Sequence, residues 1–190
     1  KDDETKLSDK TIMLRKIMSL SESPHITSDI IKSLDVTREN YRNLSRNPNV
    51  TWDIVKQNPD KPWNLEFFSA NPNITFDIVQ AHSYLPWDWY ALSANPNITW
   101  EIVQSNLDQP WDWWKLSRHP NITWDIIKAN PDKNWNYWVL PRNPNITWEI
   151  VQANPDKPWN WLQLSQHPNI TWDVIKNNPD KPWKRKDLFF

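Results

Sequence analysis

Apolar and polar residues recur along this chain with a period of 24 positions, and the shared unit reads N-P-N-I-T-W-(D/E)-I-V-(K/Q)-A-N-P-D-K-P-W-(N/D)-W-x-x-L-S-x. Internal repetition at a period of roughly 20 to 50 residues is typical of proteins built from small stacked units. Three series of positions carry the period: Thr27, Thr51, Thr75, Thr99, Thr123, Thr147 and Thr171; Trp63, Trp87, Trp111, Trp135, Trp159 and Trp183; and Leu44, Phe68, Leu92, Leu116, Leu140, Leu164 and Leu188.

The first half of each unit predicts a short helix. Thr51 is a good N-cap residue, Trp52 begins the helix, and Asp53 lies in the first turn, where the helix dipole favours a carboxylate. Asn58 precedes Pro59 and is therefore disfavoured in the α-region, which ends the helix. We expect the same cap in each consensus unit, at Thr51, Thr75, Thr99, Thr123, Thr147 and Thr171.

The second half of each unit predicts another short helix. Asp60 is the expected N-cap, because Pro62 then lies in the first turn, where its missing N–H costs nothing. The helix is expected to run to about Ala70 and to end before Pro72.

Helices of about two turns are not stable alone, so neighbouring units must supply the core. We therefore expect an all-α fold, an α-solenoid of about seven 24-residue helix-turn-helix repeats with atypical terminal repeats that seal its ends. The expected parts are an N-terminal capping helix in 1–26, a divergent first repeat in 27–50, five consensus repeats in 51–170 and a truncated or C-capping repeat in 171–190.

The composition excludes several kinds of site. The chain has no Gly and no Cys, which removes glycine-rich phosphate loops, disulfides and thiolate metal sites. The formal net charge of −1 gives no strong field toward nucleic acid or an acidic membrane, and no apolar run is long enough to span a bilayer. We expect no cofactor, no membrane association and a cytoplasmic protein; secretion is not favoured.

Candidate catalytic and metal-binding side chains are spread over the units rather than gathered. A carboxylate at the same place in each first helix is better explained by the helix dipole than by a converging catalytic pair. We therefore expect neither a metal site nor enzyme activity. The side chains concerned are His25, His82, His119 and His167, and Asp53, Asp77, Glu101, Asp125, Glu149 and Asp173.

The repeated motif also matches the acceptor sequence for N-glycosylation. A single capping motif, repeated, creates these matches, and we interpret them as incidental. They lie at Asn49, Asn73, Asn97, Asn121, Asn145 and Asn169, with one more at Asn43.

The 16 Trp residues fall into classes. Those that begin the first helices lie on its apolar arc and are expected in the core: Trp52, Trp100, Trp124, Trp148 and Trp172, with Phe76 at the same place. A second class follows the first helix at the position of Trp63 and has two interpretations; its members are Trp63, Trp87, Trp111, Trp135, Trp159 and Trp183. It packs on the neighbouring unit, which we favour, or it forms a repeated aromatic platform at the surface.

The second helix carries the positions that differ most between units. Variation within a strict repeat indicates side chains free of the packing constraint; either they line a binding face or they are simply solvent-exposed. Large aromatics in this row favour a binding face. The candidate partner-binding residues are Phe67, Tyr90, Trp114, Lys115, Arg118, Trp138, Arg142 and Gln163.

Three functions fit this pattern. We favour a non-enzymatic scaffold that binds a protein partner, because Trp, Tyr and Arg dominate interface energetics. The alternatives are single-stranded nucleic acid binding by repeated aromatic stacking, which the balanced charge disfavours, and a structural spacer whose open ends associate end to end.

The units "NPNITWEIVQANPDKPWNW" resemble the short Asn/Pro/Trp-rich tandem repeats of giant DNA viruses of amoebae, over about residues 24–183. That resemblance implies a viral protein in the host cytoplasm or the virion. It implies no activity and no catalytic residues.

Overall fold

The structure is a computed structural model that describes residues 26–33 and 38–184. It divides into two compact units, Lys1–Asn97 and Ile98–Phe190, which are treated separately below. The predicted capping helix in 1–26 lies almost wholly outside the described residues, and so do the last six residues of the predicted C-terminal cap.

The described part of the chain is all-helical and has no strand, which confirms the predicted all-α class. None of its helices is both long enough and apolar enough to cross a membrane. The first unit contains α2 (Ser28–Ser33), α3 (Arg38–Leu44), α4 (Trp52–Gln57), α5 (Leu65–Ser69), α6 (Phe76–Ala81) and α7 (Trp89–Leu92). The second contains α8 (Trp100–Ser105), α9 (Trp113–Ser117), α10 (Trp124–Ala129), the 3₁₀-helix η1 (Leu140–Arg142), α11 (Trp148–Ala153), α12 (Trp161–Leu164) and α13 (Trp172–Asn177).

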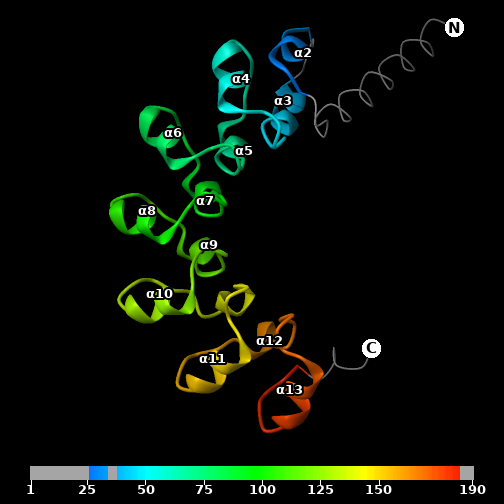
Figure 1. The fold of residues 1–190 in the computed structure, drawn as a ribbon, viewed down its shortest axis with the longest axis vertical. Helices are drawn as coiled ribbons and strands as arrows, with labels where there is room; N and C mark the ends of the chain where they lie inside the picture. Colours follow the sequence, from blue (N-terminus) through cyan, green and yellow to red (C-terminus); the bar gives the residue numbers. More distant parts are fainter. Residues whose placement is uncertain (1–25, 34–37, 185–190) are drawn as a thin grey trace, which may run out of the picture. The chain divides into compact units, whose positions relative to one another are not determined.

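Within each unit the helices form two rows (Figure 1). In the first unit α4 and α6 lie in one row, and α5 packs against α7 in the other. In the second unit α8, α10, α11 and α13 form the first row, and α12 packs against η1 in the second. We call the members of these rows first helices and second helices.

A threonine begins each of these first helices. Thr51 has extended backbone, and its hydroxyl accepts a hydrogen bond from the N–H of Ile54 at 3.4 Å. The same bond is present in α8, α10, α11 and α13, whereas Thr75 caps α6 without a side-chain hydrogen bond. Capping satisfies one of the N–H groups that have no partner within the helix.

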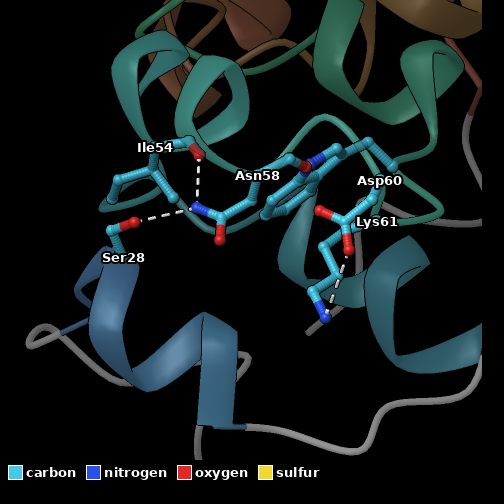
Figure 2. A network of polar contacts seen from close by, with 6 residues as sticks. Ser28, Ile54, Asn58, Asp60 and Lys61 are labelled. Atoms are coloured by element: carbon cyan, nitrogen blue, oxygen red, sulfur yellow. Dashed lines mark hydrogen bonds and ion pairs between the residues drawn. The ribbon is translucent and has the colours of Figure 1, made fainter.

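An asparagine ends each of these first helices except α6, which ends at His82, and this asparagine takes the place of the missing glycine. Asn58 is the C-cap of α4 with φ of −134°, and no described residue has a positive φ. Its side-chain Nδ2 donates to Ile54 O at 2.8 Å and to Ser28 Oγ at 2.9 Å (Figure 2). The side chain therefore satisfies a carbonyl that a left-handed glycine cap would otherwise serve.

The second helix begins later than predicted. Asp60 is not its N-cap; Asn64 is, and its Oδ1 accepts from the N–H of Phe67 at 2.9 Å. The intervening residues form a tight turn, in which the N–H of Trp63 donates to Lys61 O across Pro62 at 2.8 Å. Proline has the φ that this three-residue turn requires, so Pro62 shapes a turn rather than a helix.

A serine near the end of the second helix ties each repeat to the next. Ser69 Oγ donates to Leu65 O at 2.7 Å and accepts from the N–H of Asp88 at 2.9 Å. Ser45, Ser117 and Ser165 make the same pair of bonds.

Proline replaces that serine once. Pro141 has neither the hydroxyl nor the N–H, and the α-helix seen in the other repeats is replaced there by η1. The next repeat compensates in part, because Asn160 Nδ2 donates to Trp138 O at 3.1 Å.

The asparagine that opens the N-P-N-I-T-W motif clamps one repeat to the one before. Asn143 is fully buried; its Oδ1 accepts from the N–H of Asn145 at 2.8 Å, and its Nδ2 lies 3.1, 3.1 and 2.8 Å from the carbonyls of Ser117, His119 and Ile122. These partners are 21 to 26 residues earlier in the chain. Asn71 and Asn95 make equivalent contacts in the first unit.

Histidine takes the place of this asparagine twice without changing the pattern. His167 Nδ1 accepts from the N–H of Asn169 at 3.0 Å, and Nε2 lies 3.3 Å from Asn143 O. His119 Nδ1 likewise accepts from the N–H of Asn121 at 3.1 Å. The ring therefore presents an acceptor and a donor where the amide does.

The second asparagine of the motif is a further clamp. Asn97 Nδ2 donates to Pro72 O at 2.7 Å and to Ile74 O at 3.0 Å. Asn145 Nδ2 contacts Pro120 O and Ile122 O at 2.7 and 3.0 Å. The nitrogens that glycosylation would modify are thus already used to join repeats.

Five of the six tryptophans of the Trp63 class are buried in the core, as favoured from the sequence, and Trp63 itself is half-buried. Trp135 and Trp159 are 9% and 5% exposed, and the indole N–H of each donates to a carbonyl five residues earlier. Trp135 packs on Trp100 of the preceding first helix (5.6 Å between ring centroids) and edge-on against Trp113 of the preceding second helix (5.1 Å). Each such tryptophan therefore joins both helices of the preceding repeat.

The tryptophans that begin the first helices are less uniform than predicted. Trp100, Trp148 and Phe76 are buried, Trp52 and Trp124 are half-buried, and Trp172 is 55% exposed. Trp148 is covered by Trp183, at 5.6 Å between centroids, and Trp172 has no such ring over it within the described residues.

We predict that Pro141→Ser stabilises the second unit. The serine hydroxyl makes the two hydrogen bonds that Pro141 cannot make, each worth about 1 kcal/mol net. The unfolded chain becomes more flexible without the proline, which offsets part of this gain. The free energy of unfolding should therefore rise by about 1 kcal/mol. Urea unfolding measures the change.

Ser117→Pro is the matched reverse substitution and should cost about 3 kcal/mol. If Pro141→Ser changes neither the free energy of unfolding nor the hydrogen-exchange rate of the Asn160 N–H, the serine link does not stabilise the packing of successive repeats.

Candidate interaction surface

One variable second-helix position faces outward in several repeats, although Trp114 is half-buried there, whereas the next variable position holds the buried Phe67 and Val139. In the first unit Arg42 and Glu66 are exposed and Tyr90 is 53% exposed; in the second, Trp138 is 65% exposed and Leu162 is 38% exposed. The neighbouring position that holds Leu116 or Leu140 faces inward and is fully buried.

The second unit places six of the predicted site residues on its second helices or directly beside them: Trp114, Lys115, Arg118, Trp138, Arg142 and Gln163. We call these six residues the second-helix patch. The Arg118 guanidinium lies over the Trp114 ring at 4.1 Å from its centroid, and Lys115 Nζ lies 5.2 Å from the same centroid. Arg142 Nε donates to Gln163 Oε1 at 2.6 Å, which links η1 to α12.

The patch is cationic as well as aromatic. Three of its six residues are Lys or Arg, and the segments 113–118, 137–142 and 161–166 contain no Asp or Glu. Most carboxylates of this unit lie instead at the starts of the first helices and in the loops, as Glu101, Asp125 and Glu149 do. The exception is Asp112, which caps the second helix α9.

In the first unit the predicted residues are placed differently. Phe67 is 8% exposed, with the guanidinium of Arg46 at 3.5 Å and that of Arg42 at 4.7 Å from its ring centroid. It lies beneath two cations rather than at the surface, while Tyr90 is exposed. The sequence position alone could not distinguish the two, because the covering arginines come from the preceding repeat.

An open groove of about 830 Å³ lies beside these residues in the first unit. Its lining includes Arg42, Pro62, Trp63, Glu66 and Pro86. The extended segment between the two helices of a repeat therefore forms one wall, and the exposed second-helix positions form the other.

The carboxylate row at the first helices has the geometry of helix caps. The carboxylate of Glu101 accepts from its own backbone N–H and then from the Thr99 hydroxyl, and these bonds lower its pKa; Glu149 and Thr147 repeat the arrangement. Asp53 and Asp125 form surface ion pairs with Lys56 and Lys128 at 2.7 and 3.1 Å.

The histidines of the described residues make separate sets of contacts. His119 and His167 serve in the asparagine clamps, and His82 lies next to Tyr84 and Trp52. No group of three His, Cys, Asp or Glu side chains in the described part of the chain could hold a metal ion.

Comparison of the chain with protein-family models, with curated proteins and with solved structures finds no match. The ligand of this surface is therefore inferred from its own chemistry.

We predict that Glu101 and Glu149 contribute to the pH dependence of stability. Their folded pKa lies below the ordinary value of 4.5, so the stabilisation is complete above pH 4.5 and is lost as the pH falls through the lower folded pKa. The double substitution Glu101→Gln/Glu149→Gln should therefore flatten the fall in the free energy of unfolding below pH 4.5, as measured by urea unfolding from pH 7 to pH 2.5. An identical slope in both proteins would contradict the capping role.

Proposed function

We propose that this protein is a non-enzymatic repeat scaffold that binds a protein partner through its variable second-helix positions. The proposed architecture is an α-solenoid of about seven 24-residue repeats with atypical terminal repeats. Support comes from clamps and serine links that recur in each unit between residues 19 to 26 positions apart, so that each repeat completes the hydrogen bonds of its neighbour.

The exposure of Trp138 is the observation that carries the proposed function. A tryptophan that is 65% exposed is not required by the repeat, because the equivalent position holds Arg42, Glu66, Tyr90, Trp114 or Leu162 in other repeats. Arg142 lies four residues later, in η1, and aromatic and arginine side chains are the residue types that contribute most to protein interfaces. Tyr90 supplies a comparable exposed ring in the first unit.

The geometry favours a protein partner over a stacked nucleic acid strand. Base stacking requires free aromatic faces, yet Arg118 already lies over Trp114, and Phe67 is covered by Arg46 and Arg42. Glu66 also stands in the outward row, where it would repel phosphates.

The setting of the partner follows from the resemblance to repeats of giant DNA viruses of amoebae. We propose the host cytoplasm or the virion as the place where this protein acts. An amoebal host lysate is therefore the appropriate source of partners.

Trp114→Ala/Trp138→Ala tests the proposal. Truncation of interface hot spots costs about 2 kcal/mol or more each, so capture of the partner from host lysate should fall at least tenfold, while the far-UV circular dichroism is unchanged. The capture is run with and without nuclease.

Trp172→Ala is the matched control, because it removes an exposed indole from a first helix. Its capture should equal that of the unaltered protein. If nuclease treatment abolishes capture, the partner is a nucleic acid rather than a protein. Capture of no partner, together with self-association that Trp172→Ala abolishes, would favour a structural spacer.

A further inference from the structure

One loop in the first unit departs from the consensus. Between first and second helix, residues 58–61 read Asn-Pro-Asp-Lys, but residues 82–85 read His-Ser-Tyr-Leu. Tyr84 is 79% exposed, so the repeat does not use it for packing. The exchange replaces an acid and a base by an aromatic and an aliphatic side chain.

A cavity of about 390 Å³ lies between these two successive loops. Small-molecule pockets in proteins range from about 300 to 1,000 Å³, so this one suits a small ligand. Apolar groups of the earlier repeat form most of its lining: Trp52, Val55, Pro59, Pro62, Trp63 and Leu65. Tyr84 and Leu85 of the departing loop close the opposite side.

Every ionisable side chain on the lining is a base or a phenol. These are Lys56, Lys61, His82 and Tyr84, and no carboxylate lines the cavity. The two lysines pair with Asp53 and Asp60, whose side chains are 75% and 74% exposed. Surface ion pairs of this kind are weak, so an anion in the cavity can take over the lysine nitrogens.

The frame around the cavity is held by hydrogen bonds. Figure 2 shows the Asn58 side chain bonded to Ile54 and Ser28, away from the neighbouring Asp60–Lys61 pair. Trp52 contacts the His82 ring at 5.0 Å between centroids, and His82 Nδ1 lies 3.4 Å from the Tyr84 hydroxyl. The indole N–H of Trp52 is buried and has no acceptor among the described residues.

The consensus loops do not offer this chemistry. Some repeats of the second unit have an ion pair at the positions equivalent to Tyr84 and Leu85. In one repeat Asp156 pairs with Lys157 at 3.4 Å, and in another Asp180 pairs with Lys181 at 2.9 Å. A charged pair at that edge supplies a carboxylate, which would repel an anion, and removes an apolar wall. The cavity of the first unit is therefore specific to its departing loop.

We propose that this cavity binds a small aromatic anion, that is, a ring system of about indole or naphthalene size bearing a carboxylate or sulfonate. The ring lies among Trp52, Trp63, the two prolines and Leu85, and the anion faces Lys56 and Lys61. This site lies in the first unit and uses none of the residues of the second-helix patch, so it does not depend on the function proposed for that patch.

The test uses the whole chain and the fluorescent probe 1-anilinonaphthalene-8-sulfonate, with indole-3-acetate and tryptamine as competitors. The expected result is saturable binding at one site, displaced by indole-3-acetate at least tenfold more effectively than by tryptamine, which has the same ring and the opposite charge. Equal displacement by both would overturn the assignment of an anion.

His82→Asn/Tyr84→Asp/Leu85→Lys gives three of the four loop positions their consensus residue, leaving Ser83, and should weaken probe binding at least tenfold. Other repeats have the consensus residues at these loop positions. The variant is therefore expected to have the same circular dichroism spectrum and thermal midpoint as the unaltered protein. Undiminished binding would overturn the proposal.

The reverse graft keeps the proposal testable even if that variant unfolds. Asn154→His/Asp156→Tyr/Lys157→Leu places the departing side chains one repeat after Trp124, Lys128 and Pro131, which correspond to Trp52, Lys56 and Pro59. A second probe site is expected in this variant. A stoichiometry that remains at one would count against the loop as the determinant.

Discussion

The asparagine clamp between successive repeats is the interaction on which the rest of the structure depends. One buried amide accepts from the N–H of its own turn and donates to carbonyls of the preceding repeat, so it fixes the turn and the spacing of repeats together. Without that spacing, neither the tryptophan contacts nor the serine links could recur. Histidine serves at two of these positions because its ring also presents an acceptor and a donor, as His167 shows.

A different asparagine accounts for a chain without glycine. Many helices end with a left-handed residue, but here Asn58 ends its helix with a negative φ and satisfies a carbonyl of the last turn, that of Ile54, through its side chain. Asparagine and proline thus replace the conformational freedom of glycine with specific hydrogen bonds and a fixed φ. The scaffold is specified locally in each repeat, which leaves the outward positions of the second helices and the loop at residues 82–85 free to differ.

Periodicity was sufficient to predict the helical class, the threonine caps and the inward positions, because these depend on spacing within one helix. It placed the second helix too early, since both Asp60 and Asn64 are good caps and only the turn around Pro62 decides between them. The clamp was missed because its partners lie about one repeat away, although the exchange of Asn for His at position 119 was a sign that a donor and an acceptor are required there. The site was predicted in part for the same reason. The exposure of Trp138 follows from its place in the repeat, whereas the burial of Phe67 depends on two arginines from the preceding repeat.

The most direct test of the clamp compares Asn143→Leu with Asn143→His by urea unfolding. Leucine keeps a similar volume but leaves buried carbonyls and an N–H without partners, at a cost of about 1–3 kcal/mol. Histidine supplies an acceptor and a donor and should cost less than half as much. If leucine and histidine lower the free energy of unfolding equally, packing rather than hydrogen bonding holds the repeats together, and the clamp is not the constraint described here.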